Sequence, residues 1–121
     1  MLVDTCVVID VLRNHKLAMA YLAAMPSLPA LSVVSVAELY AGARGSRDER
    51  NIANLLNSAR LLPVTEDIAR RAGEWLRHYR GSHGVDDFDA LIAATAEHHG
   101  LPLATLNLKH FPMFPKLKPA Y

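Results

Sequence analysis

Short apolar runs alternate with longer helical segments along the whole chain, and this alternation constrains the fold more than any other feature. Apolar runs at 1–4, 31–34, 61–64 and 103–106 predict strands, and Pro63 favours an edge position for the third. The segments between them predict helices at 17–24, 35–43, 48–58, 65–79 and 88–99. Strands that alternate with helices are typical of βαβ units. The sequence therefore predicts a three-layer α/β domain with a central, mostly parallel sheet and an extra helical pair between strands two and three.

Local signals give the expected ends of several elements. Ser35 followed by Glu38 matches a capping box, which predicts that a helix begins at Ser35. Residues 80–84 are the clearest expected loop, and Asp86 and Asp87 then open the last long helix. Residues 6–12 are rich in β-branched side chains, so they fit either a helix or a strand.

Length and composition exclude several classes of protein. A chain of 121 residues with 51% hydrophobic residues fits one domain over 1–121 with a buried core. The formal net charge of +1 gives no footprint of a nucleic-acid-coating protein, although a basic rim around an acidic site would not show in a sum. The single cysteine, Cys6, excludes an intrachain disulfide and a cysteine-rich zinc site. No secretory signal or membrane-spanning run is present, so we expect a cytoplasmic protein.

Four polar residues are predicted to share one rim of the sheet. Asp4 ends the first strand and Asn107 the last, whereas Glu38 and Asp89 lie in the first turns of predicted helices. In an open parallel sheet, ligands bind beyond the carboxyl ends of the strands. If the helix that carries Asp89 packs antiparallel to its strand, its N-terminus points to this same edge. The topology thus predicts that all four side chains converge.

Three clustered carboxylates favour a metal site. Asp89 ends an apolar helical stripe, where an uncompensated charge is costly. Close carboxylates repel, and some would take up protons near neutral pH. A hard Mg²⁺ or Mn²⁺ ion removes both problems and prefers oxygen ligands. We therefore expect Asp4, Glu38 and Asp89 to be metal ligands.

Each of these acids also has an ordinary structural explanation. Asp4 could be a helix cap, Glu38 the return half of its capping box, and Asp89 a first-turn acid that answers the helix dipole. Asp86 and Asp87 read more readily as an N-cap and a solvated turn. The argument for a site rests on the coincidence of the first three at one edge.

Other residues give weaker signals. Asp10 is expected on an exposed helix face and Cys6 in the core, and the histidines are expected to be structural except His110, which stays open because it follows Asn107. The sequence contains no HExxH, GxSxG, Walker or GxGxxG motif. Nucleotide-cofactor enzymes and serine hydrolases therefore lose support.

At these residues the chain resembles PIN-domain proteins, specifically the toxin ribonucleases of VapBC-type toxin–antitoxin pairs. The matching stretches are MLVDT, SVVSVAELYAGA, DALIAATAEHHGLPLATLN and KHF, in the family's order and spacing. The resemblance implies a parallel sheet between helices and Mg²⁺- or Mn²⁺-dependent cleavage of RNA. The family's acidic quartet falls on Asp4, Glu38, Asp89 and the position of Asn107, where many members have Asp. Thr5 matches the hydroxyl residue that often follows the first Asp, and His110 stands where many toxins carry a later Asp.

The resemblance also implies a mechanism and partners. Asp4, Glu38 and Asp89 would hold a metal that activates a water for in-line attack on the phosphodiester, while Asn107 orients the water or a phosphate oxygen. Arg44, Arg47 and Lys109 are further hypotheses, as contacts to the RNA backbone. Such toxins form homodimers and bind a VapB-type antitoxin that covers a helical groove. The apolar stripes available for these contacts are Leu17, Tyr21 and Leu22, and Ile52, Leu55 and Leu56, which otherwise belong to the core.

Two other functions remain as alternatives. An inactive PIN-like module that binds RNA or protein is suggested by Asn107 and His110, which replace expected acids. An aspartate-based phosphatase of the haloacid dehalogenase kind is a different enzyme class. It typically needs a second Asp two residues after the first, and Cys6 occupies that position.

Overall fold

The protein is built around a four-stranded sheet in which every neighbouring pair is parallel. The computed structural model describes residues 1–121. Its strands β1 (Leu2–Val3), β2 (Ala30–Ser32), β3 (Arg60–Leu62) and β4 (Leu103–Ala104) stand in the order β3-β2-β1-β4. Leu2 pairs with Ala30 on one side and with Leu103 on the other. The predicted parallel sheet is thus confirmed, with β1 inside it and the proline-bounded β3 at an edge.

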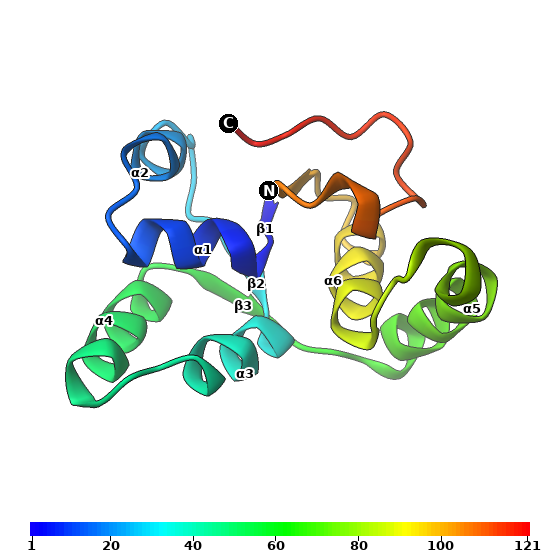
Figure 1. Cartoon of the computed structure of the whole chain (residues 1–121), viewed down its shortest axis with the longest axis horizontal. Coiled ribbons are helices and arrows are strands. Elements are labelled where there is room, and N and C mark those ends of the chain that lie inside the picture. The colour runs from blue at the N-terminus through cyan, green and yellow to red at the C-terminus, as the bar shows by residue number, and fades with distance from the viewer.

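Six α-helices cover the two faces of this sheet. They are α1 (Thr5–Leu12), α2 (Lys16–Ala23), α3 (Val33–Ala41), α4 (Ser46–Asn57), α5 (Glu66–His83) and α6 (Asp87–His98). In Figure 1, α5 and α6 lie on one side of the strands, and α1, α2 and α4 lie on the other. This is the predicted α/β/α arrangement, and α3 and α4 are the expected helical pair between strands two and three. The open choice for residues 6–12 resolves as helix.

The two faces of the sheet have separate apolar cores because side chains alternate along each strand. Leu2, Leu62 and Leu103 point into a cluster with the buried faces of α5 and α6. Val3 and Leu31 point the other way, into a cluster with α1, α3 and α4. The carboxyl edge of the sheet lies outside both cores, and polar residues cover it.

The start of α3 differs from the prediction. Ser32, not Ser35, is the N-cap, and its Oγ accepts a hydrogen bond from the backbone N–H of Val34 at 3.2 Å. Strand β2 therefore ends at Ser32, and Val33 and Val34, which were expected in the strand, begin the helix. The shift moves Glu38 into the second turn, so it is not the return half of a capping box.

The prediction of a loop at residues 80–84 is also wrong, because most of these residues are helical. Helix α5 continues through His83 and ends at Gly84, which has φ 63° in the left-handed region. An isolated glycine is tolerated inside a helix, which explains why Gly81 does not end α5. Asp86 then caps α6, as predicted.

The C-terminal segment returns across the molecule from α6 towards α1 and α2 (Figure 1). After β4 comes a short 3-10 helix, η1 (Leu108–His110). The tail then runs back until the Ala120 N–H donates to the Thr105 carbonyl at 2.9 Å. The Tyr121 hydroxyl donates to Asp10 Oδ2 at 2.6 Å. Asp10, which was expected on an exposed face, is therefore half-buried under the tail.

Candidate active site at the carboxyl edge of the sheet

Asp4 is the most firmly fixed carboxylate of the edge. It follows β1 directly, is 4% exposed and caps α1 through a hydrogen bond from the Thr5 N–H to Oδ1 at 2.8 Å. Its other oxygen, Oδ2, accepts from the Thr105 hydroxyl at 2.7 Å and from Cys6 Sγ at 3.4 Å. Asp4 does cap α1, as its ordinary structural explanation predicted. It also binds Thr105, which follows β4, and a helix cap does not need that contact. These bonds fix the orientation of the carboxylate.

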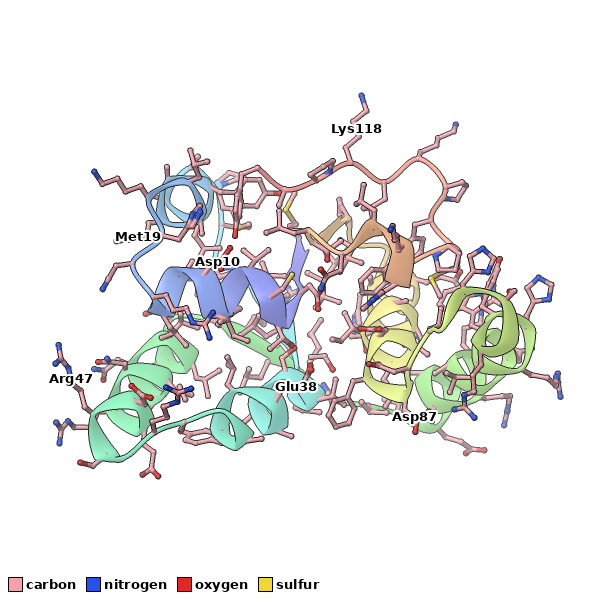
Figure 2. All side chains as sticks on the ribbon, in the orientation of Figure 1. Asp10, Met19, Glu38, Arg47, Asp87 and Lys118 are labelled. Atoms are coloured by element: carbon pink, nitrogen blue, oxygen red, sulfur yellow. The ribbon has the colours of Figure 1, made fainter.

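Glu38 reaches the same edge from α3. Its Oε1 accepts a hydrogen bond from the Thr5 hydroxyl at 2.7 Å, and that hydroxyl also lies 2.8 Å from the buried Ser35 Oγ. Thr5 thus links the first carboxylate to the second, through its N–H to Asp4 and its hydroxyl to Glu38. In Figure 2, Glu38 lies in the space between α3 and α6.

Asp89 approaches from the first turn of α6. Its N–H donates to the cap, Asp86 Oδ1, at 2.8 Å. Its Oδ2 is buried and has no hydrogen-bond partner. His110 Nδ1 lies 3.1 Å from this oxygen, but the pair does not have hydrogen-bonding geometry. Asp89 therefore carries an oxygen that is withdrawn from water and open to a further partner.

The pKa values of Glu38 and Asp89 are raised by burial and by neighbouring charges. Burial raises the pKa of Asp89 to about 7, with further contributions from the charges of Asp86 and Asp4, while His110 opposes the shift. Burial also raises the pKa of Glu38, against the hydrogen bond from Thr5 and together with the charges of Asp4 and Asp86. The charges of Asp4 and Asp86 thus act on both Glu38 and Asp89, whereas Glu38 and Asp89 do not act on each other. The convergence of all three carboxylates on one metal site therefore stays a prediction.

The donor set suits a hard divalent cation. Clustered carboxylate oxygens, one of them buried and unpartnered, are the ligands that Mg²⁺ and Mn²⁺ prefer. No group of three or more His, Cys, Asp or Glu side chains is placed so that all could hold one ion together. Mg²⁺ usually keeps several waters and takes only one or two carboxylates directly. The structure therefore shows no fully protein-ligated metal site.

Asn107 lies beside this cluster without joining it. The residue is exposed, and its backbone N–H donates to the Thr105 hydroxyl at 3.0 Å. No hydrogen bond links its side-chain amide to the three acids. Thr105, by contrast, is fully buried and bonds directly to Asp4. Thr105 was expected only as part of the strand at 103–106, so sequence reasoning missed its contact with Asp4.

Some of the remaining candidate residues lie at the rim of the three carboxylates, and others lie away from them. Asp86 is at the rim, because its charge acts on both Glu38 and Asp89. Asp87 points away, where it pairs with Arg80. Asp10 lies on the opposite side of α1 from Glu38 in Figure 2. Cys6 is half-buried, and burial next to Asp4 raises the pKa of its thiol to about 11, so it is a weak nucleophile here.

Comparison with known proteins decides the family. The sequence profile of the PIN domain matches residues 1–114. The chain belongs to the PIN-domain family. This confirms the resemblance seen at the four matching stretches, which run through the same region.

Individual relatives share parts or all of this PIN domain. The chain is 57% identical over 70 residues to Ribonuclease VapC10 of Mycobacterium tuberculosis, covering 55% of this chain and 51% of the relative. It is 59% identical over 59 residues to Ribonuclease VapC19 of the same organism, covering 48% and 47%. These matches span about half the length of the curated relatives. A solved toxin–antitoxin complex from Klebsiella pneumoniae contains a chain similar over 99% of this one and 97% of its own length, at 30% identity and TM-score 0.84.

The helices carry no membrane signal. None of them combines the length and the apolarity that crossing a bilayer needs.

Proposed function

We propose that this PIN domain is a metal-dependent endoribonuclease and the toxin of a toxin–antitoxin pair. The observation that carries the proposal is the buried Asp89 Oδ2, which accepts no hydrogen bond although His110 Nδ1 lies 3.1 Å away, and whose carboxyl group feels the charge of Asp4. Such an oxygen is costly without a cation. The similarity to VapC ribonucleases and to a toxin–antitoxin complex supports the same activity.

The residues of the edge have distinct roles in this proposal. A bound Mg²⁺ or Mn²⁺ would supply an activated water and neutralise charge on the scissile phosphate. Asp4, Glu38 and Asp89 would hold the ion, directly or through its waters. Thr5 and Thr105 keep Asp4 oriented by donating to both of its oxygens. Asn107, exposed at the mouth of the edge, orients the attacking water or a phosphate oxygen through its amide.

A matched pair of variants tests the proposal. Asp89→Asn removes a proposed ligand, whereas Asp87→Asn changes the same residue type two positions earlier in an ion pair outside the cluster. With RNA and Mn²⁺, we expect Asp89→Asn to lose at least about a hundredfold in cleavage rate, because even outer-shell partners of a metal contribute 10- to 100-fold. Asp87→Asn should cleave normally. Full activity of a folded Asp89→Asn protein would contradict the assigned role.

A second candidate function is an inactive module that binds RNA or protein. It is favoured by His110, which brings a basic ring to 3.1 Å from Asp89 Oδ2, and by the lack of a fourth acid at Asn107. Calorimetric titration with Mn²⁺ separates the two functions. An inactive module should bind no divalent ion, whereas the nuclease should bind Mn²⁺ and lose that binding in Asp89→Asn.

We further propose a VapB-type antitoxin and a second copy of this chain as partners. Most side chains of the suggested apolar stripes belong to the core. Ile52 is buried in the apolar cluster with α1, α3 and α4, and that cluster is also contacted by Tyr21, Leu22, Leu55 and Leu56. Leu17 stays 60% exposed, and Met19 on the same helix is 44% exposed. Helix α2 is therefore the better-supported contact surface. A monomer at high concentration in sedimentation experiments would remove the dimer.

A further inference from the structure

The tail, residues 111–121, contacts both apolar cores of the protein. Its first half lies against the cluster with α5 and α6, where the ring of Phe114 packs edge-on against Trp75 with 5.9 Å between the ring centroids. Its last two residues, Ala120 and Tyr121, pack against the other cluster, which contains residues of α1 and α4. The tail therefore joins helices from the two faces of the sheet, and Figure 1 shows its path from one side to the other.

The end of the tail is fixed at two places. The Ala120 N–H donates to the Thr105 carbonyl at 2.9 Å, just after β4. The Tyr121 hydroxyl donates to Asp10 Oδ2 at 2.6 Å, on the side of α1 that faces away from Glu38 in Figure 2. Burial raises the pKa of Tyr121, and the hydrogen bond to Asp10 and the charge of Asp10 raise it further. The hydroxyl therefore stays protonated, as a donor, at neutral pH.

The ring of Tyr121 has its own packing contacts. Its centroid lies 5.5 Å from that of His15 and 5.9 Å from that of Tyr21, both in tilted arrangements. His15 caps α2 by accepting a hydrogen bond from the Ala18 N–H, so the tail also contacts the start of α2. These aromatic contacts do not need the hydroxyl of Tyr121. The hydrogen bond to Asp10 can therefore be removed without removing the packing of the ring.

The contacts of the tail form a closed loop that includes Asp4. Asp4 caps the start of α1, and the same helix carries Asp10, which binds Tyr121. The neighbour of Tyr121, Ala120, binds the Thr105 carbonyl, and the Thr105 hydroxyl binds Asp4 Oδ2. A movement of the tail relative to α1 would therefore reach the Asp4 carboxylate through a single residue, Thr105.

We infer that Tyr121 and Asp10 are positioning residues for the Asp4 carboxylate. Their hydrogen bond holds α1 and the segment after β4 at the separation at which Asp4 accepts from both the Thr5 N–H and the Thr105 hydroxyl. Because Asp10 lies on the side of α1 away from Glu38, the pair acts through Asp4 and not on the substrate. The effect on rate rests on the proposed ribonuclease function, whereas the effect on the orientation of Asp4 does not.

Removal of the hydroxyl alone tests this role. Tyr121→Phe should lower kcat for RNA cleavage about three- to tenfold with KM unchanged, which is less than the roughly 10- to 100-fold effect of a residue that contacts a metal ligand directly. Asp10→Ala should have the same effect, and the double variant should be no worse than either single variant, because both changes break the same bond. Asp10→Asn still offers an oxygen to Tyr121, so it should restore nearly all of the activity. The matched control is Tyr79→Phe, because the Tyr79 hydroxyl lies on α5 and forms no hydrogen bond.

The orientation of Asp4 gives a second readout that needs no cleavage. In carboxyl-carbon NMR spectra, Tyr121→Phe should shift the Asp4 signal in the same direction as Thr105→Val, whereas Tyr79→Phe should leave it unmoved. An unmoved Asp4 signal in Tyr121→Phe, or a wild-type kcat in an enzyme that cleaves RNA, would overturn the inference even if the variant is less stable. A shifted Asp4 signal in a protein that cleaves no RNA would leave the positioning role standing and remove the ribonuclease proposal.

Discussion

Thr105, near the C-terminal end of the chain, binds the carboxylate of Asp4, near the N-terminal end. Its buried hydroxyl donates to Asp4 Oδ2 and accepts from the Asn107 N–H, so both functions of the hydroxyl are used. Thr105→Val keeps the shape of the side chain but leaves both partners unsatisfied. Such a loss costs about 1–3 kcal/mol of stability. It also frees Asp4 to rotate, as happens when the outer partner of a metal ligand is removed.

We expect Thr105→Val to lower the free energy of unfolding by about 1–3 kcal/mol and to lower kcat for RNA cleavage about 10- to 100-fold. Urea denaturation and single-turnover kinetics measure the two effects. Thr105→Ser restores the hydroxyl and should recover most of the activity. A stable, fully active Thr105→Val protein would show that Asp4 needs no such support.

Much of the residue-level site could be predicted, and the limits have a physical cause. Asp4, Glu38 and Asp89 could be predicted to share one edge because the carboxyl ends of parallel strands lie at the same edge of the sheet. Thr105 could not be singled out, because its partner is 101 residues away and a threonine after a strand is common. The contact of His110 with Asp89 depends on the path of η1, which sequence periodicity does not describe.

At the scale of elements, errors arose where two local readings were equally available. Ser32 and Ser35 both precede helical residues, and pairing of β2 with its neighbours, not the capping pattern, decides where the strand ends. Gly81 resembles a helix breaker, yet Gly84 has the left-handed conformation that ends α5. The order and type of the other helices and strands were predictable from their apolar spacing, except that residues 6–12 fitted a helix or a strand equally well.

These two glycines give opposite predictions for the same substitution. Gly81 lies inside α5 with open space around it, so Gly81→Ala should stabilise the protein by about 0.5–1 kcal/mol. Gly84 has φ 63°, so Gly84→Ala should destabilise it by about 1–2 kcal/mol. Thermal denaturation of both variants checks the signs. Destabilisation by Gly81→Ala would mean that α5 ends earlier.

At the scale of the whole molecule, the carboxylate cluster sets how stability depends on pH. The pKa of Asp89 is about 7 in the folded protein, against an ordinary value of 3.8. Between these values the folded state holds a proton that the unfolded state has released. The contribution of this group to folding stability therefore falls as the pH rises from about 4 to about 7.

Without metal, wild type should lose melting temperature relative to Asp89→Asn as the pH rises from about 5 to about 8. The difference should be about 4 °C for each 1 kcal/mol lost. Added Mn²⁺ competes with the proton, so it should raise the wild-type Tm more at pH 8 than at pH 5. Calorimetry with EDTA and then with Mn²⁺ measures both. Equal Tm profiles of the two proteins would contradict the buried charge.

The order of the strands has a consequence during translation. Strand β1 is made first, yet it pairs with β4, and Asp4 receives its hydrogen bond from Thr105. A nascent chain whose last strand is still inside the ribosome holds Asp4 only by its local contacts with Thr5 and Cys6. The topology thus delays the contact between Asp4 and Thr105 until β4 has been synthesised.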